Sequence, residues 1–331
     1  MTHASKPWIA LASTDDLPIL DGPVLDAAAD RFEVRSVSLP YKPLTRDEEI
    51  LWAEKLRGAG GILLRSGYVT ASLLDQLADL KVVAVHGAGV DPVDVVACSE
   101  RGVLVTNTPG ANADAVTEIT VGLMLALLRR IPDAAHKVRV ERAWDSARHT
   151  GGELKGRTLG LLGLGQIGRR VTMIGKAFGM RVVAHDPALD VGEIRARGAE
   201  PAKFDEVLKQ ADILSLHAPA IPETRHMIDA EAIACMKPDA MIVNCARGTL
   251  IDEKALAQAL TAGQLGGAAL DVLEGEPPNP ESPIFEAPNV ILTPHMAGST
   301  NECLTTIAQT AAVDIVRVLT GKTPIYPVNQ I

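Results

Sequence analysis

Residues 159–168 read LGLLGLGQIG, an aliphatic run that passes directly into closely spaced glycines. The glycines are Gly163, Gly165 and Gly168. A strand that turns through GxGxxG into a helix is the arrangement that binds the pyrophosphate of a dinucleotide. The first glycine permits the turn, the second admits the phosphates, and the third lets the helix pack closely on the strand. The pyrophosphate would then lie on N–H groups near Gln166 and Ile167, at the positive end of the helix.

The next predicted strand, residues 181–185, is followed directly by Asp186. An acid at this place can hydrogen-bond the ribose hydroxyls of the adenosine half and would repel a 2′-phosphate. Pro187 follows it, not an arginine. The order of strand, glycines, helix, strand and acid therefore predicts NAD as the cofactor in preference to NADP.

The composition of the 331 residues is typical of a globular protein, with 47% hydrophobic, 22% charged and only 3% aromatic residues. Aliphatic side chains must therefore fill the cores, as in α/β proteins with buried parallel strands. A net charge of −9 argues against a nucleic-acid or anionic-membrane surface. The four cysteines form no CxxC pair, and no cluster of metal ligands stands out. We expect a reduced protein without a metal.

Residues 1–20 lack the pattern of a signal peptide, and the most apolar helical run, residues 119–128, is too short to span a membrane. A cytoplasmic location is the resulting prediction.

Short aliphatic strands alternate with helical stretches along most of the chain, which predicts an α/β fold with two doubly wound parallel sheets. A single helix near residues 297–319 cannot form its own core, so we expect it to pack on the first domain. The predicted substrate domain is thus discontinuous and flavodoxin-like, residues 1–108 plus 296–331. A Rossmann-type NAD-binding domain, residues 109–295, is inserted into it.

Three segments place reactive side chains at the ends of predicted strands in the inserted domain. They are residues 244–248 (NCARG), 269–277 (ALDVLEGEP) and 293–300 (TPHMAGST). Ligands of doubly wound sheets bind beyond the carboxyl ends of the strands. Arg247, Glu276 and His295 can therefore meet one substrate there.

These residue types suit hydride exchange at C2 of a hydroxy or keto acid. A protonated imidazole at His295 can supply the proton for the C2 oxygen. Glu276 would hold the ring and favour its charged form. Arg247 offers forked donors for the carboxylate and the carbonyl oxygen. Each residue alone has an ordinary structural explanation, and only the set predicts catalysis.

Together with GLGQIG, these segments resemble the D-isomer-specific 2-hydroxyacid dehydrogenase family over nearly the whole chain. The resemblance implies that Arg247 binds and polarises the substrate, that Glu276 orients His295, and that His295 is the acid/base. It implies that further residues line the cofactor: His217, Pro219, Thr224, Cys245, Ala246, Asp271 and Gly298. Asp271 would contact the nicotinamide carboxamide. The loop HGAGVD, residues 86–91, resembles the family loop that holds the substrate carboxylate, which assigns Ala88 and Gly89 to the substrate.

Within the family the chain most resembles phosphoglycerate dehydrogenases and hydroxypyruvate/glyoxylate reductases. The substrates 3-phosphoglycerate and hydroxypyruvate/glyoxylate are equal candidates. Arg65 is the main residue that could bind a phosphate, and a surface or domain-interface charge is its alternative explanation. Other positive charge is sparse, because Gly67-Tyr68-Val69 follows Ser66 and Val85-His86 precedes the glycine loop. We expect no C-terminal regulatory domain after the last helix.

Two other functions stay open. Some proteins of this fold sense NAD(H) and act as corepressors, which needs a partner surface that the sequence does not identify. A formate-type dehydrogenase would need no proton donor, so the Glu276–His295 pair disfavours it. We also predict a homodimer, because the helix near residues 114–130 is too apolar to face solvent and the equivalent region dimerises in the family. Trp144 would cap that contact or line the partner's site.

Overall fold

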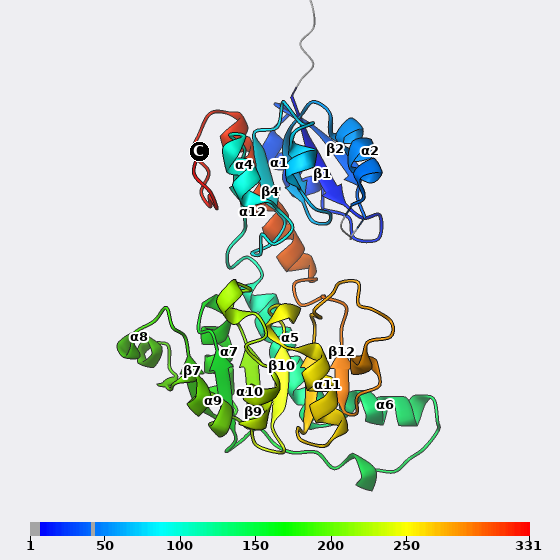
Figure 1. Cartoon of the computed structure of the whole chain (residues 1–331), viewed down its shortest axis with the longest axis vertical. Coiled ribbons are helices and arrows are strands. Elements are labelled where there is room, and N and C mark those ends of the chain that lie inside the picture. The colour runs from blue at the N-terminus through cyan, green and yellow to red at the C-terminus, as the bar shows by residue number, and fades with distance from the viewer. Residues whose placement is uncertain (1–6, 41–43) are drawn as a thin grey trace, which may run out of the picture. The chain divides into compact units, whose positions relative to one another are not determined.

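The computed structural model describes residues 7–40 and 44–331, which fold into two compact units (Figure 1). Unit 1 comprises Met1–Asn112 and Ser299–Ile331, and unit 2 comprises Ala113–Gly298. The chain thus leaves unit 1, forms unit 2 and returns, which is the discontinuous arrangement predicted. The prediction that residues 1–20 are not a signal peptide falls partly on residues 1–6, which lie outside the described residues.

Unit 1 contains a five-stranded parallel sheet in the order β2-β1-β3-β4-β5, the flavodoxin-like order. Its strands are β1 (Trp8–Ser13), β2 (Glu33–Ser38), β3 (Ala59–Leu64), β4 (Val82–Val85) and β5 (Leu104–Thr106). Its helices are α1 (Gly22–Ala28), α2 (Arg46–Leu56), α3 (Ala71–Leu74), α4 (Val95–Glu100) and α12 (Asn301–Leu319).

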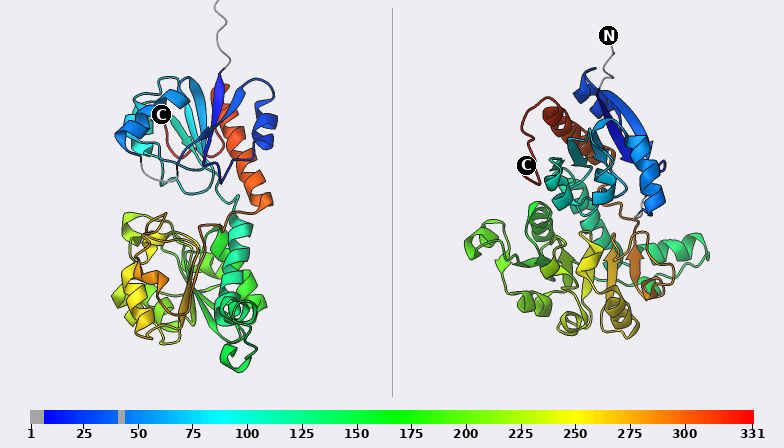
Figure 2. Two further views of the ribbon diagram at one scale, coloured as in Figure 1. Left: turned by 90° about the vertical axis from the view of Figure 1, so that its right-hand side faces the viewer. Right: turned by 45° about the horizontal axis from the view of Figure 1, so that its top comes forward.

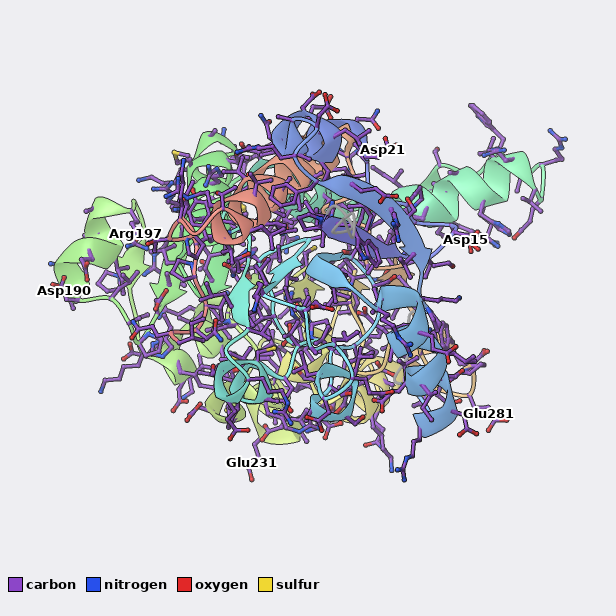
Figure 3. All side chains as sticks on the ribbon, turned by 90° about the horizontal axis from the view of Figure 1, so that it is seen from above. Asp15, Asp21, Asp190, Arg197, Glu231 and Glu281 are labelled. Carbon is purple, nitrogen blue, oxygen red and sulfur yellow. The ribbon has the colours of Figure 1, made fainter. Side chains whose placement is uncertain are left out.

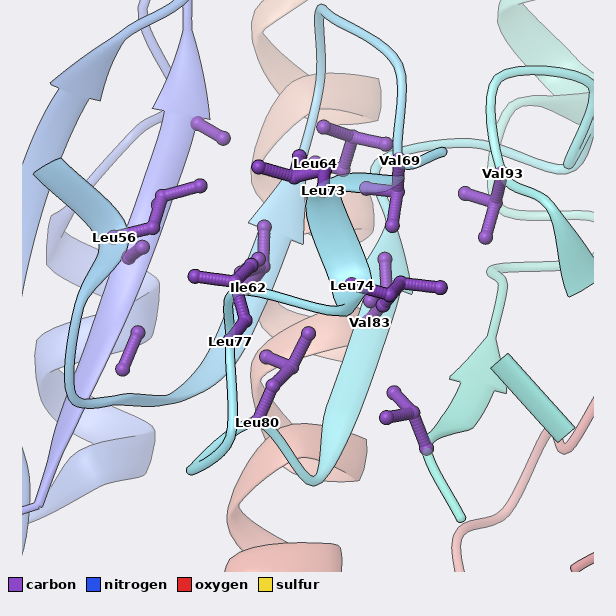
Figure 4. Packing of buried hydrophobic residues seen from close by; sticks show 14 of the residues in the cluster. Leu56, Ile62, Leu64, Val69, Leu73, Leu74, Leu77, Leu80, Val83 and Val93 are labelled. Atoms are coloured by element: carbon purple, nitrogen blue, oxygen red, sulfur yellow. The ribbon is translucent and has the colours of Figure 1, made fainter. Parts of the chain in front are cut away.

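Both faces of this sheet are covered, as the left view of Figure 2 shows. Successive strand residues point to opposite faces. Ile62 and Leu64 of β3 therefore pack on one side with Leu73 of α3, in the cluster seen in Figure 4. Leu63 packs on the other side with Ile315 of α12. The C-terminal helix thus completes the core of unit 1, as predicted.

The last helix begins four residues later than the sequence pattern indicated. Thr300 caps it, since the hydroxyl of Thr300 accepts a hydrogen bond from the N–H of Cys303 at 3.1 Å. A side-chain cap of this kind ends the preceding loop and starts the helix at Asn301.

Unit 2 contains a seven-stranded parallel sheet in the order β12-β11-β10-β9-β6-β7-β8. Its strands are β6 (Thr158–Leu162), β7 (Arg181–His185), β8 (Glu200–Pro201), β9 (Ile213–Leu216), β10 (Met241–Asn244), β11 (Gly267–Leu270) and β12 (Val290–Leu292). Its helices are α5 (Ala113–Leu128), α6 (Ile131–Arg139), α7 (Gln166–Ala177), α8 (Val191–Ala196), α9 (Phe204–Gln210), α10 (Ala230–Ala234) and α11 (Glu253–Thr261). Because β6 lies between β7 and β9, the strand order reverses there, which is the switch point where such sheets bind ligands.

The apolar helix expected near residues 114–130 is α5. It buries Val116, Leu123, Met124 and Leu127 with residues of β6 and α7. The following helix, α6, has no buried residue and extends away from the sheet of its own unit (Figure 1). None of the helices within residues 7–40 and 44–331 combines the length and apolar character needed to cross a membrane.

Candidate active site

The glycine turn of unit 2 lies at the switch point, between β6 and α7. Gly163 has a φ of 92°, a left-handed conformation that favours glycine. A Cβ atom on Gly163 would lie 2.5 Å from the carbonyl oxygen of His217, which follows β9. A Cβ atom on Gly168 would lie 2.4 Å from the carbonyl oxygen of Gly163. Contacts within the protein therefore require the first and third glycines.

The second glycine has open space around it. A Cβ atom on Gly165 would meet no heavy atom within 4 Å. The helix α7 begins at the next residue, Gln166, and the first N–H groups of a helix have no partner within it. A pyrophosphate needs such backbone donors, the positive end of a helix and no intervening side chain. Gly165, Gln166 and Ile167 therefore fit the expected dinucleotide.

Asp186 follows β7 and supports the glycine turn. Its Oδ2 accepts a hydrogen bond from the N–H of Leu164 at 2.8 Å, and its Oδ1 accepts one from the N–H of Ala188 at 3.0 Å. Arg197, near the end of α8 in Figure 3, donates to the carbonyl oxygen of Leu164 at 2.7 Å. The carboxylate is half-buried and keeps lone pairs that ribose hydroxyls can use.

The loop after β9 carries His217, Pro219 and Thr224. Burial lowers the pKa of His217 to about 4, so the ring is neutral near pH 7. Its Nε2 lies 3.0 Å from the hydroxyl of Ser215, and its buried Nδ1 has no hydrogen-bond partner among the described residues. Thr224 closes the loop by donating to the carbonyl oxygen of Pro219 at 2.6 Å. The loop thus presents an unused polar atom beside the glycine turn.

Glu276 and His295 lie in direct contact. The Nδ1 of His295 is 2.6 Å from the Oε2 of Glu276, and the two side chains are 43% and 22% exposed, so a ligand can reach them. Since Nδ1 faces the carboxylate, Nε2 is the ring nitrogen that can face a substrate. His295 has a φ of 50°, and its N–H donates to the carbonyl oxygen of Asp271 at 2.8 Å.

The hydrogen bonds by which Asp271 holds the loop of His295 were not predicted from the sequence. Asp271 is 1% exposed, and its carboxylate accepts hydrogen bonds from the Thr293 hydroxyl at 2.6 Å and from the N–H groups of Met296 and Ala297 at 2.9 and 2.8 Å. These bonds fix both sides of His295, just before Gly298. An acid directly after a buried parallel strand was the available signal. Its expected contact with the nicotinamide stays a prediction.

Asn244 holds the loop of Arg247 in a similar way, and this role was also not predicted from the sequence. Its side chain donates to the carbonyl oxygen of Arg247 at 2.8 Å and accepts from the N–H of Ala246 at 3.0 Å. Arg247 itself donates to the carbonyl oxygen of Ala246 at 2.7 Å. Burial raises the pKa of the intervening Cys245 to about 12, so its thiol stays protonated.

The segments of Arg247 and Glu276 pack against each other. A Cβ atom on Gly248, next to Arg247, would lie 1.9 Å from the backbone of Leu273. Glu276 in turn accepts a hydrogen bond from the N–H of Leu273 at 3.2 Å. Unit 2 therefore brings Arg247, Glu276 and His295 to the loops at one edge of its sheet.

The remaining expected site residues lie in unit 1. The carbonyl oxygens of Gly87 and Ala88 accept hydrogen bonds from Thr108 N–H at 2.9 Å and Asn107 Nδ2 at 2.6 Å. No hydrogen bond within residues 7–40 and 44–331 uses the N–H of Ala88 or Gly89, so both can serve an anion. Arg65 follows β3, and its Nη1 donates to the carbonyl oxygen of Pro18 at 2.5 Å.

Within the part of the chain that the structure describes, no group of three or more His, Cys, Asp or Glu residues could hold a metal ion.

Comparison with known proteins agrees with this geometry. Residues 121–297 match the model described as D-isomer specific 2-hydroxyacid dehydrogenase, NAD binding domain. A D-3-phosphoglycerate dehydrogenase of Methanocaldococcus jannaschii is 44% identical over 86% of this chain and 54% of that protein. A glyoxylate reductase of Aeropyrum pernix is 41% identical over 79% of this chain and 80% of that protein. The crystal structure of the TT0316 protein from Thermus thermophilus superimposes with a TM-score of 0.86 at 35% identity, covering 97% of this chain and 100% of that one.

The chain spans about half the length of the first of these relatives, and most of the second. The family model covers more than half of the chain, and it ends just after His295. Two parallel-sheet α/β units, an NAD-binding turn and this similarity lead to one conclusion: the chain belongs to the D-isomer specific 2-hydroxyacid dehydrogenase family.

Proposed function

We propose that this chain is an NAD-dependent oxidoreductase that exchanges a hydride at C2 of a small D-2-hydroxy acid or its keto acid. The observation that carries the proposal is the 2.6 Å contact between His295 and Glu276. It occurs in the unit that carries the glycine turn, on loops that also hold Arg247. A dinucleotide and an acid/base pair are the two components that this reaction needs.

The residues of the proposed site have different roles in the reaction. NADH, when bound, supplies the hydride to C2. His295, held through Nδ1 by Glu276, gives a proton from Nε2 to the C2 oxygen. Arg247 pairs with the carboxylate and polarises the carbonyl. The N–H groups of Ala88 and Gly89 bind the substrate carboxylate. In the oxidative direction His295 takes the proton back.

Asp186 supports NAD over NADP. Its carboxylate holds the glycine turn through the N–H of Leu164, and this position next to the turn supports a contact with the adenosine ribose. A 2′-phosphate would bring negative charge next to this acid.

The two candidate substrates, 3-phosphoglycerate and hydroxypyruvate/glyoxylate, correspond to two kinds of relative that the chain resembles. The M. jannaschii protein is named for the first and the A. pernix protein for the second. The named relatives are a dehydrogenase and a reductase, which gives the corepressor alternative no support.

A homodimer is part of the proposal. α6 has no buried residue, and its first residue, Ile131, is 52% exposed. Val140 and Trp144, which follow the helix, are 65% and 89% exposed. A partner subunit would cover this apolar surface. The cytoplasmic location stays a prediction.

The test is a steady-state panel of 2-keto acids with NADH and NADPH. We expect NADH oxidation with at least one acid and a higher kcat/KM with NADH than with NADPH. His295→Ala should lose turnover by about 10²-fold or more and still bind NADH, measured by fluorescence titration. Folded protein that oxidises NADH with no member of the panel would refute the enzyme assignment.

A further inference from the structure

Two side chains of opposite charge hold the residue between the first two glycines of the turn. The N–H of Leu164 donates to Oδ2 of Asp186 at 2.8 Å, and the carbonyl oxygen of Leu164 accepts from Nη1 of Arg197 at 2.7 Å. The nitrogen and the oxygen of one residue are at most about 4 Å apart, so the carboxylate and the guanidinium lie within about 10 Å of each other. A group bound beside Asp186 is therefore within range of the charge of Arg197.

Arg197 reaches the turn from α8. It is the C-cap residue of that helix, is partly buried, and is 33 residues from Leu164 in the sequence. Nη1 is the one guanidinium nitrogen of Arg197 that has a hydrogen-bond partner among the described residues. An arginine side chain has five N–H donors on three nitrogens, so most of its donors remain for a ligand.

No acid among the described residues forms an ion pair with Arg197. Glu193 stands four residues earlier on α8, at the spacing of a helical ion pair, but it is engaged elsewhere. Its Oε2 accepts from the N–H of Asp190 at 2.9 Å, and Oδ1 of Asp190 accepts from the N–H of Glu193 at 2.8 Å. These two acids cap the start of the helix, which leaves the positive charge of Arg197 at its end without a paired acid.

Asp186 and Arg197 have opposite effects on the same part of a dinucleotide. An acid after the second strand of such a unit favours the free ribose hydroxyls of NAD, whereas a nearby arginine accommodates the 2′-phosphate of NADP. A guanidinium is well suited to a phosphate because its planar donors can bind two oxygens at once. This chain has both residues, and both are bonded to Leu164.

We propose that Arg197 is a second residue that determines cofactor specificity. Its guanidinium attracts a 2′-phosphate on the adenosine ribose and so reduces the preference for NADH that Asp186 sets. NADPH is then a weaker alternative cofactor, and the two cofactors become nearly equivalent once the charge of Asp186 is removed. This inference rests on the proposed function, which places a dinucleotide at the glycine turn.

Fluorescence titration with NADH and with NADPH tests the role of Arg197. Arg197→Gln removes the charge and keeps a donor for the carbonyl oxygen of Leu164. It should weaken NADPH binding at least about fivefold and change NADH binding by less than about twofold, because only NADPH loses an attraction between charges. Arg197→Lys keeps the charge and should bind NADPH within about threefold of the unmodified protein. Arg195→Gln, at an exposed position of the same helix, is the matched control and should change neither affinity.

Asp186→Asn gives a test that does not depend on a variant of Arg197. The amide keeps an oxygen for the N–H of Leu164 and removes the negative charge. NADPH should then bind within about threefold of NADH, and adding Arg197→Gln should weaken NADPH binding again by at least about fivefold. A preference for NADH that stays above about tenfold in folded Asp186→Asn would overturn the proposal.

Two further results would overturn the role of Arg197. One is an equal loss of NADH and NADPH affinity in Arg197→Gln, which would leave Arg197 only as a support of the turn. The other is an equal effect of Arg195→Gln, which would show that any positive charge on the helix acts alike. Because the titrations measure binding, they are independent of turnover. NADH binding without reduction of any keto acid would refute the proposed function and leave the role of Arg197 intact, whereas binding of neither cofactor would overturn both.

Discussion

At the scale of single residues, the position of His295 is set by its neighbours. Its backbone has a φ of 50°, a conformation that is unfavourable for a residue with a side chain. Its backbone N–H donates a hydrogen bond to the carbonyl oxygen of Asp271, and the carboxylate of Glu276 contacts its Nδ1. Because the ring is 43% exposed, packing alone does not orient it, and the hydrogen bond to Glu276 must do so.

Glu276→Gln tests that hydrogen bond. We expect kcat/KM for the preferred keto acid to fall about 10²-fold, because a neutral amide neither stabilises a charged ring nor fixes its tautomer. NADH affinity, measured by fluorescence titration, should stay within about twofold. Glu281→Gln, an exposed acid of the same proline-rich loop, is the control. A Glu276→Gln protein with normal turnover would remove Glu276 from the mechanism.

At the scale of elements, the glycine turn joins β6 to α7 and has two kinds of glycine. Gly168 faces the backbone of Gly163 so closely that a Cβ atom would lie 2.4 Å from its carbonyl oxygen. Gly165 faces open space. The two glycines should therefore respond differently to the same substitution.

Gly168→Ala should lower the free energy of unfolding by about 1–3 kcal/mol, because a rigid backbone oxygen cannot move aside for the methyl group. Gly165→Ala should leave the stability within about 1 kcal/mol and weaken NADH binding at least about tenfold, because the methyl group would occupy the place of the pyrophosphate. Urea unfolding and NADH titration of both variants measure the two effects. Equal losses of stability would contradict the assignment of the open side to the cofactor.

At the scale of the whole molecule, apolar side chains remain exposed on and after α6. Val138 is 40% exposed and Val140 65%, although α5, just before them, is packed against its own sheet. Exposed large apolar side chains that lie this close in the sequence are typical of a subunit interface.

Size-exclusion chromatography with light scattering should give twice the chain mass of 35.0 kDa. Val138→Asp together with Val140→Asp should shift the protein toward the monomer, because each would place a charge in the apolar contact. Val96→Asp, at a position that is 70% exposed on α4 in unit 1, should leave the mass unchanged. A monomer in the unmodified protein would refute the dimer.

The sequence by itself determined the class of fold, because hydrophobic periodicity and turn glycines are local signals. Aliphatic runs predicted β6 and β7, and GLGQIG with Asp186 predicted an NAD-binding turn. Arg247, Glu276 and His295 were found because they lie in the segments that follow predicted strands. The family was recognisable from the same residues, and the comparisons confirm it.

Only the tertiary structure decided what holds these groups and which polar atoms stay unused. Asp271 accepts hydrogen bonds from the loop that follows a different strand, β12, whereas Asn244 bonds the loop that follows its own strand. The spacing of residues in the sequence does not encode the lengths of these hydrogen bonds. The pKa of His86 likewise depends on burial and on the charge of Arg65, which both lower it. Solvation and contacts between distant segments are properties of the folded chain, which is why the sequence left the substrate open.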